Sequence, residues 1–172
     1  MAPGKGQRLQ RSANLGVMVT DELINNVTEV WGQAGTDWLD RLPSLLAEVE
    51  ELWSIRVDDP FDLSFNYVAP AVREDGTEVV LKLGGPNDDH RREVEAIRIF
   101  RGRGAVRLLM SDPDRSAMML ERLKPGTYLG DLTDREQATS IAAGVMKQLW
   151  RPAPGQHLLP GMSDYSGSLE WL

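Results

Sequence analysis

One lysine and one glutamate stand out because each is expected to lie on a largely apolar face, where a charge needs a partner. In the run 78–83, the two-residue period of a strand places Lys82 and Val80 on one face and apolar residues alone on the other. Glu93 falls on the same helical stripe as Ile97. Because a buried charge is costly unless paired, the pattern predicts a salt bridge between Lys82 and Glu93. The alternative also stands at this stage: Lys82 extends to solvent, and Glu93 interacts with the helix N-terminus.

Other reactive side chains are scarce. The 172 residues include no cysteine, which excludes a disulfide scaffold, a thiolate metal site and a cysteine nucleophile. There are two histidines, His90 and His157, which disfavours a histidine metal centre or a Ser–His–Asp triad.

The elements that must position the pair follow from periodicity and turn residues. Thr20 is the expected N-cap of a first helix, and Thr133 with Glu136 forms a capping box for the last one. The predicted helices cover about 20–31, 38–53, 87 or 88 to 102, and a segment from 133 to about 150. The predicted strands cover 53–57, 65–72, 78–83, 105–110 and 116–123. This order predicts an α+β fold: a five-stranded, mostly antiparallel sheet with one helix packed against it.

A strand lysine, a helix glutamate and two further strands form the arrangement of a protein-kinase-like small lobe. Two motifs are more specific: Gly-x-Gly-Ala-Val-Arg-Leu-Leu at 102–109 and Leu-Glu-Arg-Leu-x-Pro-Gly at 120–126. Together with the runs 74–83 and 93–97, they resemble the aminoglycoside (streptomycin) 6-phosphotransferase and hydroxyurea antibiotic-resistance kinase family. The resemblance covers about residues 38–150.

The resemblance implies an ATP site and assigns roles residue by residue. Lys82 would hold the α- and β-phosphates, and Glu93 would fix that lysine. Val80 would pack over the adenine, and Leu120 would border the back of the pocket. The segment after the fifth strand would be the hinge, where the backbone of Glu121 and Leu123 would hydrogen-bond the adenine edge.

The sequence departs from the family in two places. The loop 58–64 between the first two strands has three aspartates and no glycine, where a protein kinase has a glycine-rich loop. The His-Gly-Asp motif, its downstream Asn and the later metal-binding Asp are absent. Gly130-Asp131-Leu132 matches half of that motif, and Asp131 is interpreted as a loop residue. We therefore expect ATP with Mg²⁺ in the complete enzyme, but assign no catalytic and no metal-binding residue within these 172 positions.

Composition and charge limit the possible partners and location of the protein. The mass is 19.2 kDa, the net charge −7 and the pI about 4.9. Arginines cluster between 91 and 107, but neighbouring acidic residues dilute them, so we expect no nucleic-acid partner. No apolar run approaches the roughly 20 residues that cross a membrane, and the N-terminal apolar stretch is too short for a signal peptide. A cytoplasmic location is the expectation.

The expected organisation is a flexible tail (1–19), N-terminal helices (20–53), a kinase-like small lobe (54–123), and a hinge, helix and start of a shortened large lobe (124–172). The leading hypothesis is the nucleotide-binding part of an ATP-dependent phosphotransferase that modifies a hydroxyl group of a streptomycin-like antibiotic, in resistance or secondary metabolism, and is inactive alone. One alternative is a non-catalytic small-lobe module that self-associates, or a decaying gene remnant. Another is a split enzyme whose large lobe is encoded separately. The acceptor stays open.

Overall fold

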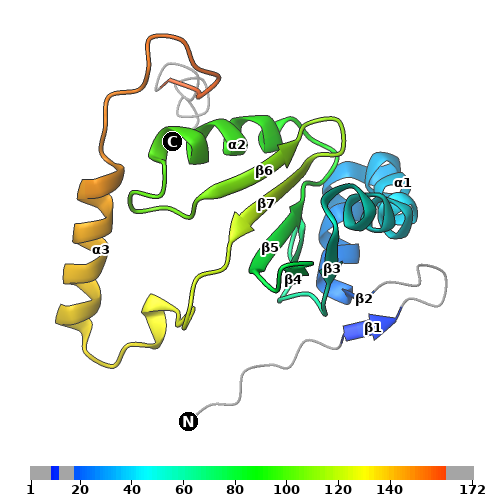
Figure 1. The fold of residues 1–172 in the computed structure, drawn as a ribbon, viewed down its shortest axis with the longest axis horizontal. Coiled ribbons are helices and arrows are strands. Elements are labelled where there is room, and N and C mark those ends of the chain that lie inside the picture. The colour runs from blue at the N-terminus through cyan, green and yellow to red at the C-terminus, as the bar shows by residue number, and fades with distance from the viewer. Residues whose placement is uncertain (1–8, 12–17, 162–172) are drawn as a thin grey trace.

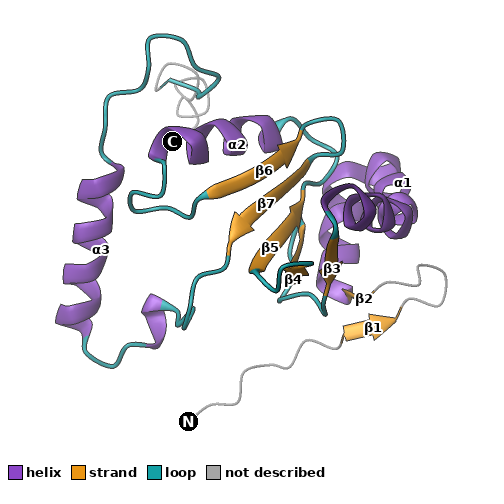
Figure 2. Cartoon of the chain, in the orientation of Figure 1, coloured by secondary structure: helices purple, strands orange, loops and turns teal. Residues whose placement is uncertain are grey.

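A single antiparallel sheet organises the chain (Figures 1 and 2). The structure is a computed structural model that describes residues 9–11 and 18–161. The sheet has the order β3-β4-β5-β7-β6, and all neighbouring strands are antiparallel. Its strands are β3 (Ile55–Val57), β4 (Tyr67–Arg73), β5 (Glu78–Leu83), β6 (Leu108–Asp112) and β7 (Ala117–Glu121). The predicted α+β fold with a five-stranded sheet is confirmed.

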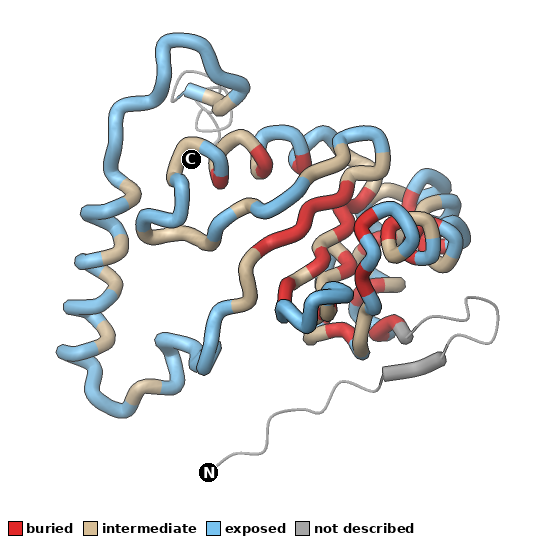
Figure 3. The backbone as a smooth tube through the Cα atoms, in the orientation of Figure 1, coloured by how far each residue is buried: buried red, intermediate tan, exposed pale blue. Residues whose placement is uncertain are grey.

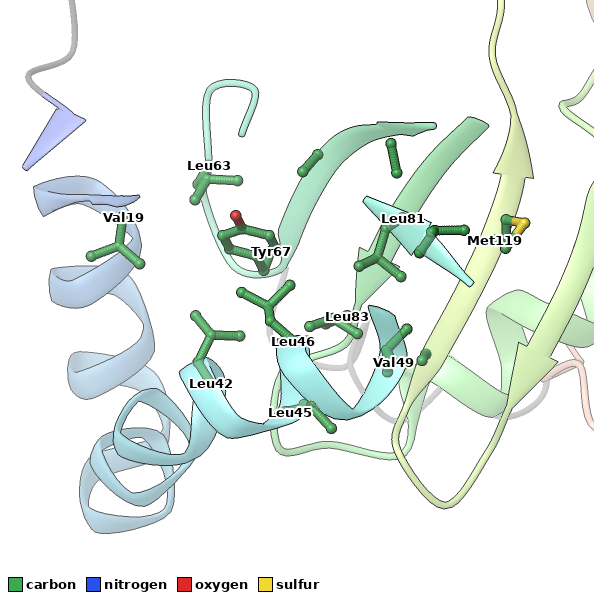
Figure 4. Close-up of a cluster of buried hydrophobic side chains, with 14 of the residues drawn as sticks. Val19, Leu42, Leu45, Leu46, Val49, Leu63, Tyr67, Leu81, Leu83 and Met119 are labelled. Atoms are coloured by element: carbon green, nitrogen blue, oxygen red, sulfur yellow. The ribbon is translucent and has the colours of Figure 1, made fainter. Parts of the chain in front are cut away.

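The first helix, α1 (Asp21–Trp53), covers one face of the sheet. Leucines and valines of its second half, spaced three and four residues apart, pack on side chains from β4 and β5 (Figure 4). Leu81 and Leu83 of β5 are fully buried there, as are Leu42 and Val49 of α1. This cluster is the larger of the two hydrophobic cores among the described residues.

The opposite face of the sheet carries α2 (Asp89–Phe100). Val94 and Ile97 of α2 pack on Met118 and Leu120 of β7, with Val80 at the edge of the cluster. Along β5, fully buried and half-buried residues alternate. The strand that carries Lys82 is therefore covered on both sides, as predicted.

The N-terminal part contains one pairing that was not predicted. Residues 9–11 (β1, Leu9–Arg11) and 18–20 (β2, Met18–Thr20) pair as a two-stranded antiparallel ladder; residues 1–8 and 12–17 lie outside the described part. The two predicted helices are confirmed as the two parts of α1, which are separated by a kink at Gly32 (φ 53°, ψ −125°), where the positive φ favours glycine. Thr20 is the N-cap, as predicted, and its hydroxyl accepts a hydrogen bond from the Leu23 N–H.

Several predicted boundaries are wrong by one to three residues. Strands β3 and β4 each begin two residues later than predicted, and β7 is shorter at both ends. Strand β6 begins at Leu108 because the preceding segment turns through Gly102 and Gly104, both with positive φ. Helix α2 ends at Phe100, where Arg101 adopts a left-handed C-cap conformation and its N–H binds the Ile97 carbonyl.

The last helix, α3 (Arg135–Leu149), lies away from the sheet and has no buried residue (Figure 3). Its N-cap is Asp134, whose carboxylate accepts a hydrogen bond from the Gln137 N–H, so the capping box predicted at Thr133 and Glu136 is wrong by one residue. The short Asp side chain at 134 reaches the exposed N–H groups of the first turn. The predicted apolar face of this helix is present but uncovered: Ile141, Met146 and the following Trp150 are exposed. Among residues 18–161, no helix combines the length and hydropathy needed to cross a bilayer.

Candidate functional site

The predicted salt bridge is present and joins β5 to α2. Lys82 Nζ lies 2.6 Å from Glu93 Oε1. The Lys82 side chain is 17% exposed and that of Glu93 37% exposed, so the ammonium is largely enclosed but still reachable from solvent. Because Lys82 extends from a strand that is held on both sides and Glu93 sits in the first half of α2, the pair places a positive charge at a defined position over the sheet.

An apolar surface surrounds the ammonium on the sheet. Val80 lies two residues before Lys82 on the same strand face, directly opposite Leu120 of β7 and Pro70 of β4. Val80 and Pro70 are half-buried, while Leu120 is 9% exposed. The predicted neighbours Val80, Lys82, Glu93 and Leu120 thus lie together on one face. A planar apolar ring with an anionic group beside it would match this surface.

The predicted hinge residues differ from one another in their backbone environment. The Glu121 N–H donates to the Arg107 carbonyl at 3.0 Å, so it is not available to a ligand. The carboxylate of Glu121 accepts from the Arg107 N–H (2.8 Å) and from Arg107 Nε (2.7 Å), and this hydrogen bonding lowers the pKa of Glu121. Leu123 lies two residues beyond β7 and is 54% exposed. The role of the Glu121 side chain in holding β6 to β7 is one that the sequence reasoning missed.

The loop between β3 and β4 folds toward the hinge without any glycine. The Arg122 guanidinium lies 4.7 Å from the centre of the Phe61 ring, a cation–π contact between this loop and the residue after β7. Leu63 is buried in the main core, and Asp58 pairs with Arg56. Of the three aspartates at 58–62, one is therefore neutralised by an arginine. The contact between Phe61 and Arg122 had no local signal in the sequence, since it joins residues far apart in the chain.

A buried histidine lies just before Glu93. His90 is 3% exposed, and among the described residues its ring nitrogens have no hydrogen-bond partner within normal limits. Burial lowers its pKa below the ordinary value of 6.5, and the positive charges of Lys82 and Arg91 act in the same direction. Glu93 and the backbone of Ala117 oppose the shift without cancelling it.

This histidine is expected to make the fold sensitive to mild acid. The unfolded chain takes up a proton at His90 before the folded chain does, so stability is lost as pH falls below about 6.5. His90→Phe, which retains a flat ring without a titrating group, should remove that loss between pH 7 and pH 5.5. Urea unfolding at several pH values measures the free energy of unfolding. If this free energy falls equally with pH in the unmodified chain and in His90→Phe, His90 is not the cause of the acid sensitivity.

The half-motif at 130–132 does not contribute to this site. Asp131 closes a three-residue 3₁₀ turn, η1 (Leu129–Asp131), rather than the loop expected, and is exposed. Within the described residues, no three or more histidine, aspartate or glutamate side chains gather as a metal site would require. We therefore assign no magnesium ligand within the described part of the chain.

The structure explains why glycine occupies positions 102 and 104 of the 102–109 motif. Gly102 and Gly104 have φ of 73° and 74°, a region that side chains rarely adopt. A Cβ on Gly104 would also lie 3.1 Å from the Val145 carbonyl oxygen of α3. The motif thus forms the tight turn between α2 and β6, and at Gly104 this turn packs closely against α3.

The fold and the Lys82–Glu93 pair together define a kinase-like N-terminal lobe: an antiparallel sheet whose strand lysine is paired with the glutamate of a helix packed on it. The chain belongs to the aminoglycoside/hydroxyurea antibiotic resistance kinase family, which it matches over residues 57–169.

Curated relatives agree with this assignment. The chain is 36% identical over 148 residues to hydroxyurea phosphotransferase of Kitasatospora aureofaciens, covering 84% of the chain and 44% of the relative. It is 31% identical over 154 residues to streptomycin 6-kinase of Streptomyces glaucescens, covering 89% of the chain and 50% of the relative. Streptomycin 6-kinase of Streptomyces griseus is 30% identical over the same share of each chain. The chain therefore spans about half the length of these relatives. No solved structure matches significantly.

Proposed function

We propose that this chain forms the nucleotide-binding lobe of an ATP-dependent phosphotransferase that transfers a phosphoryl group to a hydroxyl group of a streptomycin-like antibiotic. The observation that carries the proposal is the enclosed Lys82–Glu93 pair beside the apolar surface of Val80 and Leu120. Family membership supports the reaction class, because its relatives are named as antibiotic phosphotransferases. Because the reaction consumes ATP, the proposal includes a cytoplasmic location.

Each predicted residue has a role in this proposal. Lys82 would bind the α- and β-phosphates, and Glu93 would hold the ammonium in position through its 2.6 Å contact. Val80 and Leu120 would contact the adenine face. The adenine edge would be bound by the carbonyl of Glu121 and the backbone of Leu123, since the Glu121 N–H is already used. Residues 54–123 would be the small lobe, and 124–172 the hinge and the beginning of the second lobe.

The proposal places nucleotide binding in this chain and acceptor recognition in a different region. The matched relatives are about twice as long as this chain, and we propose that the acceptor site lies in the half that the match does not cover. A separately encoded large lobe would supply such a region, whereas self-association belongs to the alternative of a non-catalytic module. Streptomycin and hydroxyurea are both named in the relatives, so both are test acceptors.

Calorimetric titration of ATP, ADP and adenosine tests the phosphate role of Lys82. Lys82→Met is expected to weaken ATP and ADP binding by about 10-fold or more, the loss typical of a charge-assisted contact, and to leave adenosine binding unchanged. Glu93→Gln should weaken ATP less, because the ammonium remains but is no longer held by a charge. Lys147→Met, on the exposed face of α3, removes the same charge elsewhere and is the matched control.

Three results would contradict the proposal: no ATP binding by the unmodified chain, equal ATP affinity in Lys82→Met, or an equal loss for adenosine. The last would mean that the substitution damages the lobe rather than a phosphate contact. Circular dichroism of each variant separates that damage from a specific effect.

A further inference from the structure

A cavity lies on the side of α2 that faces the chain segment after α3. Figure 1 shows this segment returning over α2, and the Leu158 N–H donates to Glu95 Oε2 at 2.8 Å. The cavity between the two has a volume of about 1060 Å³, at the upper end of the range for small-molecule sites. Lys82, Glu93 and the other predicted nucleotide contacts are not among its lining residues, so it is separate from the candidate ATP surface.

The cavity is strongly positive. Five arginines line it: Arg91, Arg98, Arg101, Arg103 and Arg151. None of them forms a salt bridge within the described part of the chain, where the ion pairs use other cations. The lining includes one carboxylate, Glu95, which already accepts the Leu158 N–H. The cavity is therefore positively charged although the chain as a whole has a net charge of −7, and a bound anion would balance this local positive charge.

The uncharged part of the lining is apolar. Val94, Ile99 and Leu158, with prolines 113, 152 and 154, supply that surface. His90 also lines the cavity, but both of its ring nitrogens are buried and are not counted as ligand contacts. The site therefore combines guanidinium groups with apolar walls, which together suit an organic anion rather than a bare ion.

We propose that this cavity binds an organic phosphate monoester whose apolar body contacts the α2 and 152–158 walls. A phosphate monoester carries close to two negative charges and three acceptor oxygens at neutral pH, which several guanidinium groups can share. A monocarboxylate offers one charge and two oxygens, and leaves more of the arginines unpaired.

Phenyl phosphate is a direct probe, and amide chemical-shift titration of the ¹⁵N-labelled chain locates and quantifies its binding. The expected result is saturable shifts in α2 and 151–158, weaker binding of benzoate and of inorganic phosphate, and none of phenol. Arg91→Gln with Arg103→Gln should raise the Kd about 10-fold or more, as expected for two lost charge-assisted contacts. Arg73→Gln with Arg135→Gln makes the same charge change away from the cavity and should leave the Kd unchanged.

Each other outcome overturns the proposal. An equal loss in both double variants would mean binding to net charge alone, and equal affinity for benzoate would reject the phosphate specification. Lys82→Met should not affect phenyl phosphate. If Lys82→Met abolishes these shifts, phenyl phosphate binds at the candidate nucleotide surface instead of the cavity. This proposal does not depend on the ATP experiments, so their failure alone would not contradict it.

Discussion

Replacing Gly35 with alanine is expected to destabilise the fold by about 3 kcal/mol, the upper end of the usual cost of overpacking. Gly35 follows the break in α1 and is buried against the part of the helix before the break. A Cβ at this position would lie 2.2 Å from the Val27 carbonyl oxygen and 2.9 Å from Val27 Cγ1. Because the nearest atom is backbone, the two halves of α1 would have to move apart, which disturbs the main core at Val27.

Thermal unfolding measures this effect, and the chain holds its own control. The melting temperature of Gly35→Ala should fall by about 6–12 °C, using about 2–4 °C per kcal/mol for a chain of this size. Gly144→Ala changes a glycine in the middle of α3, where a Cβ would meet nothing within 4 Å. That variant should be about 0.5–1 kcal/mol more stable, because alanine favours the helix. If the melting temperature of Gly35→Ala rises as that of Gly144→Ala does, a Cβ at position 35 does not clash with Val27 and the prediction is wrong.

The Lys82–Glu93 pair was predictable because its signals are local. Strand β5 has the predicted bounds, 78–83, since its alternation is regular and a Gly-Gly-Pro run ends it. Glu93 lies on an apolar helical stripe a short distance along the chain. Two charges on covered faces of consecutive elements have few other partners, so the pattern pointed to the pair but left open that Lys82 extends to solvent, and the structure decides for the pair.

Contacts between distant segments could not be predicted in this way. Arg115 hydrogen-bonds Glu48 of α1 (3.0 Å) and Asp112 (2.9 Å), which ties the β6–β7 turn to the first helix. Arg122 stacking on Phe61 is of the same kind. No periodicity in one segment indicates which residue of another it meets. The ladder of β1 with β2 was missed for a related reason: three-residue strands are too short to show alternation.

The arginine cluster shows that a charge count along a segment does not describe the charge of one helix face. Along the sequence, acidic residues between 88 and 95 are interspersed with the arginines. In the structure, helical geometry places most of the acidic side chains away from the arginines, although Glu95 lines the cavity with them. Glu93 faces Lys82 and Asp89 pairs with Arg92, while Arg91, Arg98 and Arg101 line the cavity on another side of α2. Net charge along a segment therefore says little about the charge of one face.

The 172-residue chain, supplied with ATP, Mg²⁺ and either streptomycin or hydroxyurea, is expected to give no acceptor-dependent ADP release. Phosphoryl transfer in this class relies on positioning and charge stabilisation, through an aspartate that orients the acceptor hydroxyl and further residues that hold the metal. The sequence has no His-Gly-Asp motif with its downstream Asn, and Asp131 lies in an exposed 3₁₀ turn. Loss of these residues removes many orders of magnitude in rate, whereas the ATP binding proposed at Lys82 does not depend on them.

A coupled ADP assay with streptomycin 6-kinase of Streptomyces griseus as the positive control measures this separation of binding from turnover. Acceptor-dependent ADP release that disappears in Lys82→Met would prove the chain catalytic and contradict the prediction. Release that persists in Lys82→Met would point to a contaminating enzyme. Binding without turnover is the pattern expected of a nucleotide-binding lobe that lacks its catalytic residues. The absence of both would favour the alternative of a non-catalytic module or gene remnant, because the paired lysine would then have only a structural role.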